Sequence, residues 1–175
     1  MAVRQLVRFV GQLSRPLGRW LAGLLPVSVP GLSPGAEPLA KGGKVAVIGG
    51  GTMGTGIAGL CAQTDHKVLL LDVSEEAAQK AKDRIINGRP PAVDDPEKAG
   101  NITFGTIDND LALVANYDWI CEAVVEDLPT KRALFEKLEP LRRENSVIST
   151  NTSGIPLRDI TQGMPDSLKN NIAVT

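Results

Sequence analysis

Histidine and cysteine are scarce in this chain of 175 residues, which contains one histidine and two cysteines. Cys61 and Cys121 lie far apart in apolar segments and no Cys-x-x-Cys pair occurs, so we expect two buried thiols rather than a disulfide framework. The same scarcity argues against a structural zinc site, and we expect no metal ion. A single imidazole, His66, is left for acid–base chemistry.

Aromatic residues and net charge are also low, at 3% of the chain and −1. The core must therefore consist mainly of Val, Ile, Leu and Ala. The small net charge hides two unlike parts, because residues 1–40 carry +3 and residues 41–175 carry −4. This balance argues against nucleic-acid binding. Pro and Arg interrupt every apolar run of the basic part before about 20 residues, so we expect no transmembrane span.

Residues 1–40 form a basic extension with four arginines and one acid. On a helical wheel, the arginines of residues 3–21 share one side and apolar residues cover the other. Three interpretations stay open: an extension without packed structure, a mitochondrial transit peptide, or an amphipathic helix on an anionic membrane surface. Prolines and glycines in residues 26–43 are typical of a linker. We therefore assign residues 1–40 to extension and linker and residues 41–175 to one folded domain.

Short apolar runs alternate with helical patterns along residues 41–175. We expect strands within residues 44–48, 67–72, 102–104, 117–125, 146–150 and 171–174, and helices within 57–64, 74–87, 130–141 and 157–161. Residues 88–101 are rich in Pro and Asp and are expected to form a loop. The alternation predicts an α/β fold with helices on both faces of a mainly parallel sheet.

A glycine-rich turn follows the first expected strand and opens a helix. Its Gly-x-Gly-x-x-Gly pattern consists of Gly49, Gly50, Gly51, Thr52, Met53 and Gly54. In this context the glycines permit a tight turn, a close approach of a pyrophosphate to the backbone, and close packing of helix on strand. The free N–H groups of the helix start attract phosphates. The turn predicts a Rossmann-type, doubly wound fold that binds a dinucleotide, with a turn that merely packs as the alternative.

Asp72 ends the second expected strand, where a carboxylate accepts hydrogen bonds from the hydroxyls of an adenosine ribose. It would repel a 2′-phosphate, and Val73 rather than an arginine comes next, so NAD is favoured over NADP. A surface acid without a ligand is the alternative. His66 precedes this strand, at the opposite end of the sheet, and we interpret it as structural.

A second group of polar residues follows the fourth and fifth expected strands. Glu126 and Lys131 come after residues 117–125, and Asn151 and Ser153 come after residues 146–150. Loops that follow parallel strands gather at one edge of a sheet, so these side chains should face the nicotinamide end of the cofactor. Glu126 and Lys131 could instead form a solvated ion pair, and Asn151 and Ser153 could serve turn hydrogen bonds alone.

With these motifs in order, residues 44–175 resemble the NAD-binding domain of L-3-hydroxyacyl-CoA dehydrogenases, enzymes of fatty-acid β-oxidation. The matching stretches are residues 45–58, Asp72, residues 122–131 and residues 151–156. The resemblance implies that Glu126 and Lys131 contact NAD. It further implies that Ser153 is a catalytic residue that lies near the nicotinamide and binds the 3-oxygen of the substrate, with Asn151 helping to orient it.

The sequence also departs from that family in two ways. Residues 88–101 are short and acidic where the family has a lysine-rich helical pair that helps to bind CoA. The chain also ends at Thr175, before the family's histidine base and its helical C-terminal domain. We therefore expect NAD binding without turnover by this chain alone, and a homodimer only for a full-length protein.

Two other functions stay open, a sister dehydrogenase of another 3-hydroxy acid and a short, non-catalytic NAD-binding protein. The expected substrate is of the acyl-CoA type. The expected location is the mitochondrial matrix if residues 1–40 are a transit peptide, and the cytoplasm otherwise.

Overall fold

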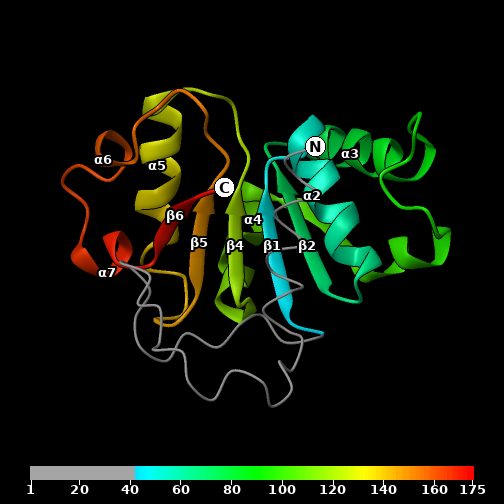
Figure 1. Ribbon diagram of the computed structural model, residues 1–175, viewed down its shortest axis with the longest axis horizontal. Helices are drawn as coiled ribbons and strands as arrows, with labels where there is room; N and C mark the ends of the chain where they lie inside the picture. The colour runs from blue at the N-terminus through cyan, green and yellow to red at the C-terminus, as the bar shows by residue number, and fades with distance from the viewer. Residues whose placement is uncertain (1–41) are drawn as a thin grey trace, which may run out of the picture.

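A six-stranded parallel sheet forms the centre of residues 42–175, the part of the chain that the computed structural model describes. The expected extension at residues 1–40 lies outside the described residues. The strands run in the order β3-β2-β1-β4-β5-β6, and every neighbouring pair is parallel (Figure 1). Their bounds are β1 (Lys44–Ile48), β2 (Lys67–Asp72), β3 (Ile102–Thr106), β4 (Trp119–Glu122), β5 (Val147–Thr150) and β6 (Ile172–Val174). The predicted α/β, doubly wound fold is confirmed.

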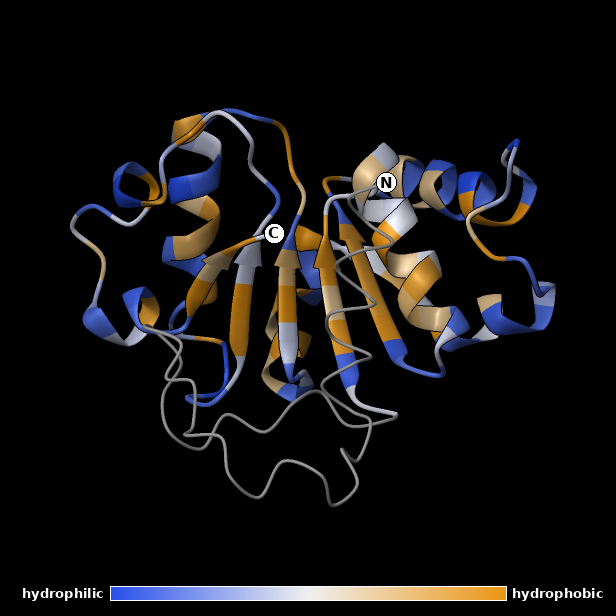
Figure 2. Ribbon diagram, viewed as in Figure 1, coloured by the Kyte–Doolittle hydropathy of each residue, from blue (hydrophilic) through white to orange (hydrophobic). Residues whose placement is uncertain are grey.

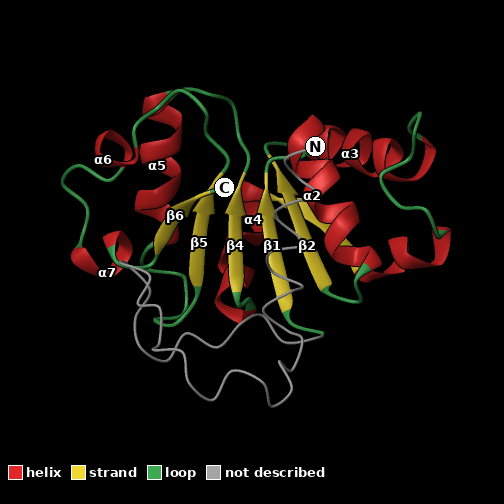
Figure 3. Ribbon diagram, in the orientation of Figure 1, coloured by secondary structure: helices red, strands yellow, loops and turns green. Residues whose placement is uncertain are grey.

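Helices connect the strands and cover both faces of the sheet (Figure 3). They are α2 (Thr52–Gln63), α3 (Glu75–Asn87), α4 (Ile107–Asp110), α5 (Leu128–Leu138), α6 (Leu157–Ile160) and α7 (Asp166–Lys169), with 3₁₀ helices η1 (Pro96–Asn101) and η2 (Leu111–Asn116). Side-chain caps explain where the two long helices α3 and α5 begin. The Ser74 hydroxyl accepts from the backbone N–H of Ala77 at 3.2 Å, and the Asp127 carboxylate accepts from that of Thr130 at 3.0 Å.

Two apolar layers hold the sheet, because successive strand residues point to opposite faces. Val45 and Val47 pack in one buried cluster with residues of α2 and α3. Ala46 and Ile48 pack in the other with residues of η2, α5 and α6. The strands are apolar along most of their length (Figure 2), as expected for strands covered on both sides. The charged residues Asp72 and Glu122 stand at strand ends, at the edge where the arrows in Figure 1 end.

Three short helical segments differ from what the sequence predicts. Residues 88–101 were expected to be a loop, but their second half is η1. Asp95 caps it by accepting from the N–H of Glu97 at 2.9 Å, and Pro96 occupies its first turn. The turns of residues 107–116 and 166–169 were not expected at all. Segments of one or two turns are too short to show a helical period, so only their caps mark them.

Candidate functional site

The loops that follow β1, β2, β4 and β5 emerge side by side at one edge of the sheet (Figure 1). Ile48 is paired with Leu71 of β2 and with Glu122 of β4, and Glu122 is paired with Thr150 of β5. The register therefore brings together at one edge the glycine turn, Asp72 and the two polar segments, which are the residues that directly follow β4 and β5. This is the arrangement that the sequence predicts.

The glycine turn has the geometry of a phosphate cradle. Gly49 has φ +108°, and a Cβ there would lie 2.5 Å from the carbonyl oxygen of Ala123. A Cβ on Gly54 would lie 1.8 Å from the carbonyl oxygen of Gly49, so α2 packs against the turn as only glycine allows. A Cβ on Gly51 would meet nothing within 4 Å, because this residue faces open space.

The start of α2 is exposed and has no side-chain cap. Gly51 is the N-cap residue, and no acidic residue lies in the first turn. Thr52 and Met53 are exposed beside it, and Met53 is 42% accessible. The first N–H groups of the helix are thus available to an anion, and the helix dipole favours one.

Asp72 is tied to the same turn. One carboxylate oxygen accepts from the backbone N–H of Gly50 at 2.9 Å, and the other accepts from that of Val73 at 2.7 Å. A Cβ on Gly50 would lie 2.6 Å from the carboxylate. Arg84 of α3 also reaches this turn, since its guanidinium donates to the carbonyl oxygen of Gly50 at 2.9 Å. Sequence reasoning missed Arg84, because it lies in the body of α3, well beyond the residues that directly follow β2.

Lys131 is fully buried, with the carboxylate of Glu122 as its main partner. Its ammonium donates to the two Glu122 oxygens at 2.7 and 2.9 Å and lies 3.4 Å from an oxygen of Glu126. Glu122 is also buried and accepts further bonds from the N–H of Val124 at 2.7 Å and the hydroxyl of Thr150 at 2.5 Å. An ion pair of Glu126 with Lys131, which the sequence left open as an alternative, is present, but Lys131 is buried and Glu122 is its closer partner. The position of Glu122, four residues before Glu126, was the only sign of this contact in the sequence.

Glu126 joins the two polar segments. Its carboxylate accepts from the Thr152 hydroxyl at 2.5 Å and from the N–H groups of Gly154 at 2.9 Å and Ser153 at 3.1 Å. The Thr152 and Gly154 bonds, followed by that of Ser153 and the charge of Lys131, lower the pKa of Glu126 to about 2. Glu126 is therefore an anion at neutral pH, and it fixes the loop after β5.

Asn151 and Ser153 both lie on this fixed loop. The N–H of Asn151 donates to the carbonyl oxygen of Glu122 at 2.7 Å, which continues the β4–β5 pairing beyond the strands. Ser153 is exposed, and its hydroxyl has no hydrogen-bond partner among residues 42–175. The structure thus brings together Glu126, Lys131, Asn151 and Ser153, and it leaves the Ser153 hydroxyl available to a ligand.

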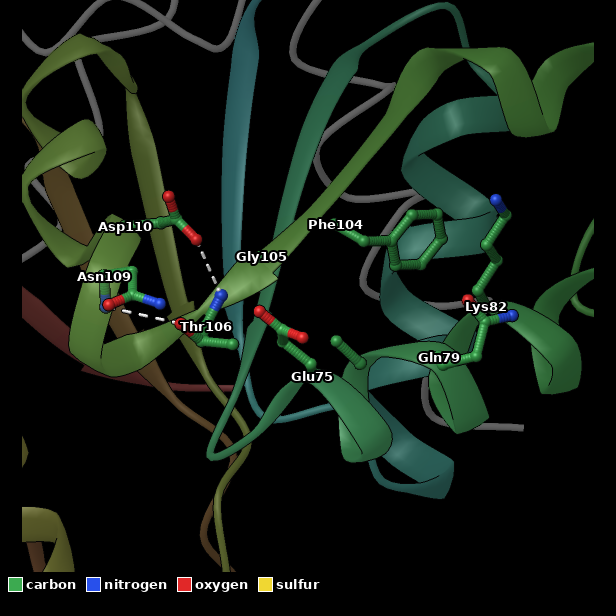
Figure 4. Close-up of a pocket in the computed structure, with 9 residues that line it drawn as sticks. Glu75, Gln79, Lys82, Phe104, Gly105, Thr106, Asn109 and Asp110 are labelled. Atoms are coloured by element: carbon green, nitrogen blue, oxygen red, sulfur yellow. Dashed lines mark hydrogen bonds between the residues drawn. The ribbon is translucent and has the colours of Figure 1, made fainter.

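A pocket lies beyond Asp72, between α3 and the end of β3 (Figure 4). Phe104 and Lys82 face each other there, with the Lys82 nitrogen 6.0 Å from the ring centroid. Thr106, which also lines the pocket, is paired with Asp72 across β2 and β3. The pocket therefore borders the Asp72 end of the site, and sequence reasoning did not identify its residues.

The remaining candidate residues lie away from this edge. Cys61 and Cys121 are buried free thiols, as predicted, and burial raises their pKa values to about 12 and about 11. His66 precedes β2 at the opposite end of the sheet, and its ring accepts or donates a bond with the Thr64 hydroxyl at 2.9 Å. Burial, the largest influence, lowers the pKa of His66. Within residues 42–175, no cluster of three metal-ligating side chains occurs, and no helix is long and apolar enough to cross a membrane.

Comparisons with known proteins agree on one family. Residues 44–173 match the family described as 3-hydroxyacyl-CoA dehydrogenase, NAD binding domain. A Rickettsia felis protein described as a fatty acid oxidation complex trifunctional enzyme is 37% identical over 139 residues, which cover 75% of this chain and 19% of that protein. The mitochondrial hydroxyacyl-coenzyme A dehydrogenase of Rattus norvegicus is 32% identical over 127 residues, covering 66% of this chain and 40% of the rat enzyme.

Solved structures give the same result. The 3-hydroxybutyryl-CoA dehydrogenase of Escherichia coli superposes with a TM-score of 0.65 at 33% identity, covering 75% of this chain and 29% of that structure. The chain thus spans less than half the length of each of these relatives.

Proposed function

Because the chain belongs to the 3-hydroxyacyl-CoA dehydrogenase family, whose NAD-binding domain matches residues 44–173, we propose that it supplies the cofactor half of an enzyme that oxidises a 3-hydroxyacyl-CoA. The observation that carries the proposal is the open cradle at the start of α2. Gly51 leaves the space above the turn free, the helix start is uncapped, and Asp72 stands beside it. The acyl-CoA substrate is proposed from the relatives.

The residues present fit NAD. The exposed N–H groups at the start of α2 would hold the pyrophosphate, and the open space in front of Gly51 lets it approach the backbone. The Asp72 carboxylate would accept from the ribose hydroxyls. Its two backbone donors, Gly50 and Val73, fix its orientation beforehand.

The loop after β5 would serve the nicotinamide and the substrate. Glu126 and Lys131 would position the cofactor together, because buried Lys131 fixes Glu126 and Glu126 fixes the loop. Asn151 and Ser153 would orient the substrate, with the free hydroxyl of Ser153 donating to its 3-oxygen. When bound, NAD supplies the acceptor for the hydride from C3.

Oxidation of the C3 hydroxyl also requires a base for its proton, and histidine suits that role near neutral pH. His66, the only histidine of the chain, lies at the other end of the sheet. We therefore propose that residues 1–175 bind NAD but do not turn over a 3-hydroxyacyl-CoA alone.

Two measurements on the 175-residue chain test both parts. Titration with NADH, followed by the fluorescence of the reduced nicotinamide, is expected to give saturable binding. Incubation with NAD and 3-hydroxybutyryl-CoA is expected to produce no NADH. Absence of binding would contradict the NAD assignment, and steady NADH production would contradict the proposed lack of turnover.

The connection between α3 and β3 favours a second candidate substrate class. Residues 88–101 are acidic and form only η1, whereas the resembling enzymes carry a lysine-rich helical pair that helps to bind CoA. A sister dehydrogenase of a free 3-hydroxy acid is therefore the alternative. Tighter binding of free 3-hydroxybutyrate than of its CoA thioester by the NADH complex of this chain would favour it.

A mitochondrial matrix location is proposed from the basic segment 1–40 and the mitochondrial relative. Fusion of residues 1–40 to a fluorescent protein tests it directly. Import is expected, and import that persists after replacement of the four arginines by glutamine would contradict the reasoning.

A further inference from the structure

Arg84 occupies an unusual position for a residue in the middle of a helix that follows β2. Its guanidinium extends from α3 to the glycine turn and donates to the carbonyl oxygen of Gly50 at 2.9 Å. Ala81, one turn earlier on α3, lies against the same glycine, since a Cβ on Gly50 would approach the Ala81 side chain to 2.6 Å. The close packing of α3 on the turn is what brings Arg84 within reach.

Gly50 therefore stands between a cation and an anion. Its N–H donates to Asp72 and its carbonyl oxygen accepts from Arg84. Arg84 and Asp72 do not form an ion pair within residues 42–175, and Arg84 is exposed. An arginine side chain has five N–H donors, so most of those of Arg84 are still available to a ligand.

The Asp72 carboxylate accepts from two backbone donors beside the glycine turn. The N–H groups of Gly50 and Val73 both point at its carboxylate, at 2.9 and 2.7 Å. If that negative charge were removed, these N–H groups and the Arg84 guanidinium, which is bonded to the same glycine, would be the hydrogen-bond donors on this side of the turn. Backbone N–H groups and a guanidinium are both good donors to phosphate oxygens.

We propose that Arg84 is a second residue that selects the cofactor, and that the negative charge of Asp72 prevents it from binding a 2′-phosphate. With Asp72 ionised, the site takes the 2′-hydroxyl of NAD and repels a 2′-phosphate. Without the Asp72 charge, Arg84 binds the 2′-phosphate of NADP. This inference rests on NAD binding by the glycine turn.

The test compares NADH and NADPH affinities of the 175-residue chain and its variants. Asp72→Asn removes the charge and keeps an oxygen for the Gly50 N–H, and Asp72→Ser is a second, smaller replacement. Each is combined with Arg84→Ala. Arg89→Ala is the matched control, because Arg89 is an exposed arginine that lies two residues past the C-terminal end of α3, away from the glycine turn. Circular dichroism identifies the folded variants.

We expect the unsubstituted chain to prefer NADH and Asp72→Asn to bind NADPH more tightly than before. Adding Arg84→Ala should then weaken NADPH binding by about tenfold, as for the loss of a guanidinium–phosphate contact, with NADH binding changed much less. Adding Arg89→Ala should leave the NADPH-to-NADH ratio unchanged, and Arg84→Lys should restore part of the NADPH affinity. A merely structural role for Arg84 would weaken both cofactors equally.

Two results would overturn the inference. An equal NADPH-to-NADH ratio with and without Arg84, in both the Asn and Ser backgrounds, would remove its selecting role while leaving NAD binding intact. Failure of the unsubstituted chain to bind NADH would instead overturn NAD binding itself, and the selecting role with it.

Discussion

Replacement of Lys131 by methionine should strongly destabilise the domain. The Lys131 ammonium is fully buried and donates to both oxygens of Glu122, which is itself fully buried. Methionine keeps most of the volume but removes the positive charge. A buried carboxylate would then remain without its counter-charge. Breaking a buried ion pair by removing one partner costs about 3–5 kcal/mol.

The remaining contacts of Glu122 set the magnitude within that range. Its carboxylate keeps the N–H of Val124 at 2.7 Å and the hydroxyl of Thr150 at 2.5 Å. We therefore expect a loss near the lower limit, about 3 kcal/mol. With a urea dependence of about 1.5–2 kcal/mol per molar, the unfolding midpoint should fall by about 1.5–2 M. Trp119, buried in β4 and hydrogen-bonded to Ser149, supplies the fluorescence signal.

Two further variants separate the charge from other effects. Lys137→Met removes an exposed lysine from the same helix and should change the midpoint little. Glu122→Gln combined with Lys131→Met removes both charges and should regain most of the lost stability. A double variant as unstable as Lys131→Met alone, or a Lys131→Met midpoint equal to that of Lys137→Met, would refute the reasoning.

Three further results are expected. Gly49→Ala should lower the free energy of unfolding in urea by about 2 kcal/mol or more, because Gly49 has a positive φ and a Cβ there would lie 2.5 Å from Ala123. Gly51→Ala should leave the stability of the domain unchanged and weaken NADH binding at least about tenfold in titration. The pKa of Glu126 is lowered, so its stabilising bonds should be complete above about pH 4.5 and be lost as the pH falls toward about 2; the unfolding free-energy difference between wild type and Glu126→Gln should shrink over that window. The Arg142 side chain is only 2% exposed and donates to Glu139 at 2.7 Å and to the Ser167 carbonyl oxygen at 2.8 Å. Arg142→Met should therefore lower Tm by about 10 °C in calorimetry and leave the NADH affinity unchanged.

The parallel sheet and the edge at which the candidate residues meet could be predicted because both follow from local patterns. Short apolar runs that alternate with helical periods indicate parallel strands with crossover helices. The glycine pattern then identifies which strand end holds the turn, and Asp72 at the end of the next strand is its neighbour. The short helices of residues 107–116 and 166–169 could not be predicted, since a single turn has no period to detect.

The partners of the site residues depended instead on contacts between distant segments. Lys131 stands in the first turn of α5, where its spacing from Glu126 left a solvated ion pair open as an alternative. The β4–β5 register places Thr150 beside Glu122 and closes that position to water, so the buried Glu122 carboxylate has the greater need for the ammonium. Arg84 reaches Gly50 only because Ala81 lets α3 approach the turn. Short-range patterns thus predict which loops meet, whereas burial decides which oxygen each cation contacts. The Glu122→Gln and Lys131→Met cycle and the Arg84 variants test directly which oxygen each cation contacts.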